Sequence, residues 1–167
     1  MATKKPQTVQ YRRKREGKTS YQKRMKLLMS GQPRVVVRLT NQKIIGQVIS
    51  FNGKGDLVLA GTDSFALKKL GWKGSCKNIP SAYLTGLLLG KKTLDQKCSE
   101  AVFDTGLRGS FGQGRIAAFL KGAIDAGLNI PFGSEEIFPA EERINGAHIN
   151  ESLKNDIKII KQKIMGK

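Results

Sequence analysis

The distribution of positive charge limits what the beginning of this chain can fold into. The first 34 residues contain eleven Lys and Arg side chains and one acidic residue, Glu16, so they carry +10 of the chain's formal net charge of +17. A segment of this composition repels itself and cannot form a packed core alone. We therefore expect an extension that contacts a polyanion, either a nucleic acid or an anionic membrane surface.

The rest of the chain has the charge balance of an ordinary globular domain with a basic tail. Residues 35–150 keep a net charge of only +4, and the last 17 residues add +3. A chain of 167 residues with 39% apolar residues is expected to form one domain with extensions. We divide it into a basic arm with a short helix (1–33), an α/β domain (34–149) and a basic amphipathic C-terminal helix (150–167).

Several classes of protein are disfavoured by the sequence. Cys76 and Cys98 have neither a C-x-x-C spacing nor a nearby histidine, which disfavours a zinc site and a disulfide framework. No apolar run approaches the length of about 18 residues that a membrane span needs. The N-terminus lacks the apolar segment of a secretion signal. We expect a cytoplasmic protein with two reduced thiols.

The hydrophobic periodicity predicts the α/β (α+β) class, with a single domain and a mixed sheet. Three antiparallel strands that form a meander are predicted at 34–39, 43–51 and 56–62. Helices are predicted at 21–29, 63–70, 81–98 and 113–126, and after Asn150. A fourth strand, at 100–107, follows a helix and is expected to run parallel to its neighbour. The C-terminal helix carries an apolar stripe, expected to pack on the domain or on a partner, formed by Ile149, Leu153, Ile157, Ile160 and Ile164.

Candidate RNA contacts gather in the arm and on one face of the first strand. Arg34 and Arg38 alternate with Val35 and Val37, so the arginines share the face opposite to these valines. Aromatic side chains in a basic segment can stack on unpaired bases, whereas Trp72 is interpreted as a loop anchor. The residues predicted on these grounds to bind RNA are Tyr11, Arg12, Arg13, Lys14, Arg15, Lys18, Tyr21, Arg24, Arg34 and Arg38.

A glycine-rich turn, GSFGQGR at 109–115, lies between a predicted strand and a predicted helix. Backbone N–H groups at a helix N-terminus suit a phosphate, and Arg115 adds a charged donor. The segment matches neither a P-loop nor G-x-G-x-x-G, so a mononucleotide cofactor is not expected. Gly112, Gln113, Gly114 and Arg115 are therefore candidates for holding an RNA phosphate. The alternative is a tight turn that needs glycines only for packing.

A second hypothesis is a metal-dependent nuclease with a ribonuclease-H-like topology, because such enzymes need several converging carboxylates. The candidate carboxylates are Asp56, Asp63, Asp104 and Asp125. Only Asp104 is expected at the end of a strand, and the single His148 has no Ser or Cys partner in a recognisable motif. The sequence therefore does not support catalysis.

Five segments, in order along the chain, resemble one known family. They are RVVVRLTNQKIIGQVIS (34–50), PSAYLTGLLLGKK (80–92), VFDTGL (102–107), GRIAAFLKGAIDAGLNIP (114–131) and ERINGAHI (142–149). Together they are similar to the large-subunit ribosomal protein eighteen family, which binds 5S rRNA, and in particular to its archaeal and eukaryotic branch. Several spaced motifs in register are more specific than any one of them.

The resemblance implies a scaffold without cofactor, membrane or small-molecule substrate. Its role would be to hold 5S rRNA in the central protuberance of the large subunit and attach it to the large rRNA, beside neighbouring ribosomal proteins. The family's strand end appears as Arg38-Leu39-Thr40-Asn41, followed by Gln47, which adds Thr40, Asn41 and Gln47 to the predicted RNA contacts. The family's His-Gly-Arg turn appears as Gln113-Gly114-Arg115, where Gln keeps hydrogen bonding but removes a possible cation.

Overall fold

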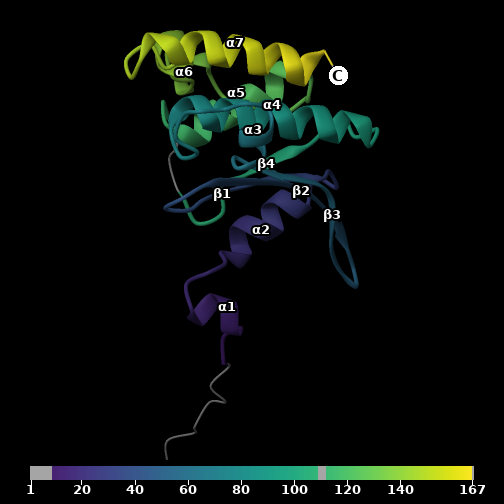
Figure 1. The fold of residues 1–167 in the computed structure, drawn as a ribbon. Helices are drawn as coiled ribbons and strands as arrows, with labels where there is room; N and C mark the ends of the chain where they lie inside the picture. Colours follow the sequence, from purple (N-terminus) through teal and green to yellow (C-terminus); the bar gives the residue numbers. More distant parts are fainter. Residues whose placement is uncertain (1–8, 109–111, 167) are drawn as a thin grey trace, which may run out of the picture.

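A four-stranded mixed sheet organises the protein, whose computed structural model describes residues 9–108 and 112–166 (Figure 1). Its strands are β1 (Arg34–Leu39), β2 (Ile44–Asn52), β3 (Gly55–Asp63) and β4 (Val102–Asp104). The strand order is β3-β2-β1-β4, and β1 pairs antiparallel with β2 and parallel with β4. This arrangement confirms the predicted α/β class, the meander and the parallel fourth strand.

Helices cover both faces of the sheet. They are α1 (Arg12–Arg15), α2 (Tyr21–Leu28), α3 (Ala66–Lys69), α4 (Ile79–Asp95), α5 (Arg115–Asp125), α6 (Glu141–Ile144) and α7 (Glu151–Met165), with a 3₁₀ turn at Glu135–Ile137. Figure 1 shows α4 and α5 above the sheet, α6 and α7 above this helix pair, and α2 and α1 on the opposite side. The arm and the C-terminal helix therefore lie at opposite ends of the molecule.

Helix α4 forms the centre of the core. The side chain of its N-cap, Asn78, accepts a hydrogen bond from the backbone N–H of Ser81 at 2.9 Å, and Pro80 lies in its first turn. Glycines let α4 and α5 approach closely, since a Cβ at Gly86 would overlap the carbonyl oxygen of Phe119. A Cβ at Gly122 would likewise overlap the carbonyl oxygen of Tyr83.

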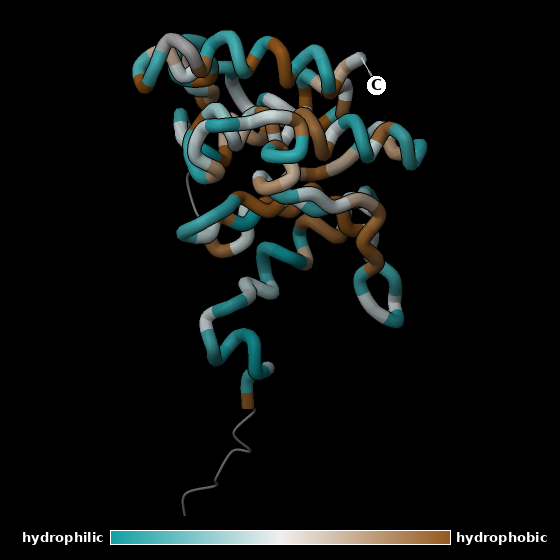
Figure 2. The backbone as a smooth tube through the Cα atoms, viewed as in Figure 1, coloured by the Kyte–Doolittle hydropathy of each residue, from teal (hydrophilic) through white to brown (hydrophobic). Residues whose placement is uncertain are grey.

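The sheet has one apolar face and one mixed face, as the alternation in β1 predicted. Val35 and Val37 are buried in the main core, whereas Arg38 is exposed. Figure 2 shows hydrophilic residues through α1 and most of α2, and hydrophobic residues along the central strands. Neither α1 nor α2 buries a residue completely, although Leu27 and Leu28 of α2 are half-buried, so polar contacts contribute to holding the arm.

Some predicted boundaries were wrong. The strand predicted at 100–107 is only Val102–Asp104, because Gly106 adopts a left-handed conformation with φ +65° soon after it. The helix predicted at 63–70 is shortened to α3, and α1, α6 and the 3₁₀ turn were not predicted. Ile149 is 51% exposed and does not belong to the apolar stripe of α7, whose other four members are buried.

Among the described residues, no helix is both long enough and apolar enough to span a bilayer. Trp72 is buried, with its Nε1 donating to the carbonyl oxygen of Ser75 at 3.2 Å, which confirms its interpretation as a loop anchor.

Candidate nucleic-acid interface

Ion pairs join the arm to the sheet on the side opposite to α4. Arg34 of β1 is only 4% exposed, and it donates from Nη1 to Asp104 and from Nη2 to Asp56, at 2.8 and 2.9 Å. Arg24 of α2 donates to both carboxylate oxygens of Asp56, at 2.8 and 2.9 Å. Because a buried charge is costly unless it is paired, these contacts restrict where α2 can lie on the sheet.

The start of α2 is held by a second set of contacts. Lys23 Nζ donates to Thr105 Oγ1 at 2.8 Å and to the carbonyl oxygen of Arg108 at 3.1 Å. The side chain of Ser20 caps the helix by accepting from the backbone N–H of Lys23 at 3.4 Å. The cap stabilises the first turn of α2, and the two contacts of Lys23 Nζ bring the N-terminus of α2 to the segment that follows β4.

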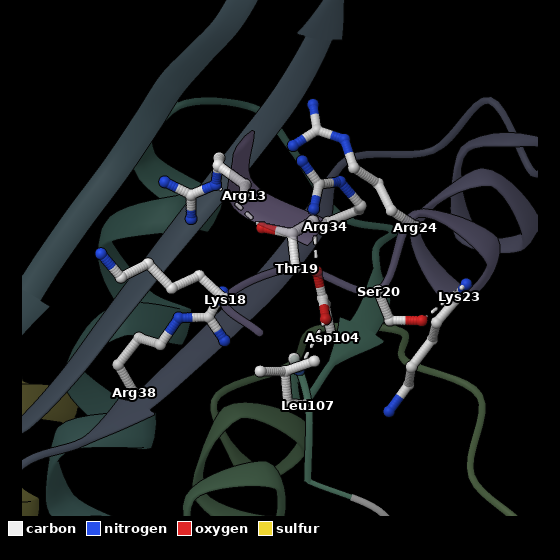
Figure 3. A pocket seen from close by; sticks show the side chains of 11 residues that line it. Arg13, Lys18, Thr19, Ser20, Lys23, Arg24, Arg34, Arg38, Asp104 and Leu107 are labelled. Atoms are coloured by element: carbon white, nitrogen blue, oxygen red, sulfur yellow. Dashed lines mark hydrogen bonds and ion pairs between the residues drawn. The ribbon is translucent and has the colours of Figure 1, made fainter. Parts of the chain in front are cut away.

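A basic cavity lies where the arm meets the sheet (Figure 3). Six cationic side chains and one carboxylate, Asp104, line it. The cations are Arg13, Lys18, Lys23, Arg24, Arg34 and Arg38. They come from the segment before α2, from α2 itself and from β1, so the fold brings together charges that are separated in the sequence.

Two further hollows continue this basic surface toward α5. The second hollow shares Arg13, Lys18 and Arg38 with the cavity and reaches Arg108. The third shares Arg108 with the second and is also lined by the residues Leu39, Thr40, Asn41, Ser75, Lys77, Asn78 and Arg115. A row of positive charge with hydroxyl and amide groups beside it can bind the backbone of a nucleic acid.

The arm's remaining cations are largely available to a partner. Lys14 and Arg15 are exposed and form no ion pair with another described residue. Arg12 and Lys18 share Glu16, with nitrogen–oxygen distances of 2.9 Å in both pairs. Exposed pairs of this kind contribute little to stability, so a phosphate can replace the carboxylate at small cost.

Tyr11 and Tyr21 contact each other, an arrangement that the sequence did not predict. Their ring centroids are 5.3 Å apart, with an angle of 40° between the ring planes. Tyr11 remains 73% exposed and Tyr21 36% exposed, so ring surface is left open to a base.

The backbone of the glycine-rich turn is hydrogen-bonded to a distant part of the chain. Gly109, Ser110 and Phe111 lie outside the described residues, but Gln113 has φ +51° and donates from its backbone N–H to Ile137 O at 2.6 Å. Gly114 is the extended N-cap of α5, and a Cβ there would approach no atom closer than 3.7 Å. Gly112 has open space around it. Among the described residues, no atom lies close enough to require glycine at 112 or 114, and the backbone of Gly114 is not left-handed.

Arg115 lies at the third hollow, where its Nη1 donates to the carbonyl oxygen of Lys77 at 3.2 Å. Thr40 organises the turn between β1 and β2, since its Oγ1 accepts from the N–H of Lys43 at 2.9 Å and donates to its carbonyl oxygen at 2.8 Å. The structure thus brings Thr40, Asn41 and Arg115 to one hollow.

Two predicted RNA contacts have surroundings that the sequence did not predict. Gln47 is half-buried in β2, where it pairs with Val36 and Gly61 and lines none of the three hollows. Arg34 lines the basic cavity but is buried between two carboxylates, and each of its terminal nitrogens already donates to one of them.

Sequence reasoning missed three cations of the surface: Lys23, Lys77 and Arg108. Charge alone did not distinguish them from solvated lysines and arginines elsewhere in the chain. The side chain of Lys23, for example, is placed by a hydrogen bond to Thr105, 82 residues away, so no local pattern indicates its position.

The four candidate carboxylates of the nuclease hypothesis do not converge as a metal site. Asp56 and Asp104 bind Arg34, and Asp125 accepts from the hydroxyl of Tyr83 at 2.7 Å. Burial alone would raise the pKa of Asp63, but its hydrogen bond to Lys43, at 2.6 Å, and the charge of Lys43 lower that pKa overall. Within residues 9–108 and 112–166, no three His, Cys, Asp or Glu side chains are placed to hold a metal ion.

Comparison with known proteins identifies relatives of the chain. Residues 5–103 match the family described as "Ribosomal large subunit proteins 60S L5, and 50S L18". The chain is also 48% identical, over 151 residues, to the "Large ribosomal subunit protein uL18" of Methanococcus maripaludis. That alignment covers 89% of this chain and 78% of the relative.

Proposed function

The chain belongs to the family of ribosomal large subunit proteins 60S L5 and 50S L18, and from this premise we propose that it binds 5S rRNA. In this role it helps to attach 5S rRNA to the large rRNA in the central protuberance, next to other ribosomal proteins. Family membership makes it a protein of the large subunit of the cytoplasmic ribosome. Its role there is to position RNA, without catalysis.

The observation that carries the proposal is the cavity with six cations and one carboxylate, together with the two hollows that continue it. Charges at this density attract phosphates and release counterions when an RNA replaces them. The hollows run from the arm, across the end of β1, to the start of α5.

The parts of the surface have different tasks in this proposal. Exposed arm cations such as Lys14 and Arg15 provide affinity that depends little on sequence. The Tyr11–Tyr21 pair offers a ring face to an unpaired base. Asn41 and Arg115, held on the rigid domain, offer donors that fix the RNA's orientation.

Binding of 5S rRNA, measured by filter binding against an unrelated structured RNA of equal length, tests the proposal. We expect 5S rRNA to bind more tightly at every salt concentration, and the protein to co-sediment with large subunits in high salt. Equal affinity for both RNAs would contradict specific 5S binding. Cleavage of either RNA that requires Mg²⁺ would instead support the nuclease hypothesis.

A further inference from the structure

One buried donor in the basic cavity has no partner. Arg34 lines this cavity, and its Nε forms no hydrogen bond with any described residue, although the side chain is only 4% exposed. Its two terminal nitrogens already donate to Asp104 and Asp56. A buried donor without an acceptor is destabilising and rare in folded proteins, so an acceptor from outside the chain would account for it.

The charges around this donor show what kind of acceptor fits. In Figure 3, Arg13, Lys18 and Arg38 gather on one side of Asp104, while Lys23 and Ser20 lie on the other. The N-terminus of α2, at Ser20, adds its own partial positive charge. Cations held this close together repel one another unless an anion lies between them.

The size of the cavity restricts the anion. Its volume of about 70 Å³ has room for several water molecules, which is also enough room for one phosphate group. The hollow beside it shares Arg13, Lys18 and Arg38 and is open enough for the chain on either side of such a phosphate to leave the cavity.

The backbone at Gly106 leaves space for the guanidinium of Arg38, one of the cations of the cavity. Gly106 has φ +65°, and a Cβ at this position would overlap the guanidinium of Arg38. The N–H of Gly106 donates to Asp104 Oδ1 at 2.7 Å, while Oδ2 of the same carboxylate accepts from Arg34. Gly106 thus lets Arg38 reach the cavity wall and orients the carboxylate that holds Arg34.

We propose that the cavity binds a single backbone phosphate of the RNA and that this phosphate fastens the arm to the sheet. Phosphate oxygens accept from Arg34 Nε and Arg38 on the sheet, and Arg13 and Lys18 close over them from the arm. This inference rests on the proposed function for the identity of the RNA. It adds a specific anion site and makes the arm's position depend on the ligand.

Two glycine substitutions distinguish an effect on the anion site from the general effect of backbone strain. Gly106→Ala pushes the Arg38 guanidinium aside without removing a charge. Gly31→Ala is the matched control, because Gly31 has φ +69° but no atom within 4 Å of an added Cβ. Both variants pay a similar cost for left-handed backbone. Arg38→Gln is a third variant that removes the charge and leaves the backbone unchanged.

Inorganic phosphate tests the site without RNA. We expect phosphate to raise the melting temperature of the full chain above its value in chloride at equal ionic strength, because a ligand of the folded state stabilises it. The Gly31→Ala variant should keep this shift, and Gly106→Ala and Arg38→Gln should lose most of it. An equal shift in all four proteins would overturn the site.

Ethylation interference tests the RNA's part, with 5S rRNA ethylated at about one phosphate per molecule. We expect one position whose ethylation weakens binding to the wild type and to Gly31→Ala by about tenfold, but leaves binding to Gly106→Ala unchanged. Identical interference patterns for all proteins would overturn the RNA phosphate as the ligand. If 5S rRNA does not bind but the phosphate shift persists, the proposed function fails while the anion site is supported.

Discussion

The two sides of the sheet are stabilised by different forces. On the α4 and α5 side, glycines allow close helix contact, and side chains such as Phe119 and Leu84 are completely buried. On the α2 side, neither arm helix buries a residue completely, and ion pairs and hydrogen bonds to β1 and to the segment after β4 hold the arm.

Because of this difference, we expect protein stability and RNA binding to depend on opposite sides of the sheet. Apolar packing is not weakened by ionic screening and needs no counter-charge, so we expect the helical side to fold without a partner. The arm side gathers more positive charge than its few carboxylates compensate, and screening or an anion must reduce the repulsion. Substitutions on the helical side should therefore change the free energy of unfolding, and substitutions on the arm side should change RNA affinity.

The largest effect is expected from Gly86→Ala. The new Cβ would overlap the backbone of Phe119, which cannot move without separating α4 from α5. We expect unfolding to become easier by about 3 kcal/mol or more, with RNA affinity per folded molecule unchanged. Urea denaturation measures the first quantity and filter binding the second.

Gly133→Ala is the control for this prediction, since an added Cβ there meets no atom within 4 Å. It should leave the unfolding free energy within about 0.5 kcal/mol of wild type. A similar loss in both variants would show that the close contact of α4 and α5 is not the cause.

The second largest effect is expected when Arg12, Arg13, Lys14 and Arg15 are all changed to Ala. RNA affinity should fall on the order of a hundredfold, and the slope of log affinity against log salt should flatten by about 3, since each duplex phosphate contact contributes about 0.9. The melting temperature should change little, because α1 buries no residue. Selectivity for 5S rRNA should survive better than affinity.

An unchanged salt slope in this variant would mean that these four residues of the arm do not contact RNA phosphates. A large fall in melting temperature would contradict the comparison itself, since it would make the arm part of the folded core.

The sequence predicted the long elements because their patterns are local. The strand 34–39 agrees with β1 at both ends, and the apolar spacing of 113–126 contains α5. Gly31 and Gly127, which follow α2 and α5, adopt left-handed conformations with φ +69° and +106°, as glycines at helix C-termini commonly do. Each of these features is determined by residues within one or two helical turns.

The environment of Arg34 could not be predicted in the same way. Its carboxylate partners lie 22 and 70 residues away, and only the register of β1 with β4 and the course of β3 bring them together. Alternation in β1 correctly placed Arg34 on the face opposite the main core, but alternation does not tell whether a helix covers that face. The grouping of Thr40 and Asn41 with Arg115 likewise depends on tertiary structure.

A smaller effect is expected at Arg115, which lies where the two regions meet. It begins α5 on the helical side, yet its guanidinium lines the third hollow of the basic surface. Arg115→Ala should weaken RNA binding by on the order of 1–3 kcal/mol, and Arg115→Lys by less, because lysine keeps the charge but loses the planar donor. Filter binding of both variants measures this loss.

Thermal melts of the Arg115 variants show whether the residue contributes to stability or to RNA binding. Its hydrogen bond to the carbonyl oxygen of Lys77 is exposed, so its loss should cost less than about 1 kcal/mol of stability. A lowered melting temperature with unchanged RNA affinity would mean that Arg115 only supports the turn.

The smallest effect is expected from Tyr83→Phe, which removes a polar contact from the apolar side. The Tyr83 hydroxyl donates to Asp125 at 2.7 Å and joins α4 to α5, so its loss should cost about 1 kcal/mol. Burial, and then the hydrogen bond to Asp125, raise the pKa of Tyr83 well above its ordinary value of 10.0. The contact is therefore fully stabilising below pH 10 and weakens as the pH rises further. Denaturation of both proteins between pH 8 and about 11 should show their stability difference shrinking above pH 10, whereas Tyr21→Phe, at a partly exposed ring, should match wild type throughout. A difference that stays constant with pH would mean that only packing around the ring was lost.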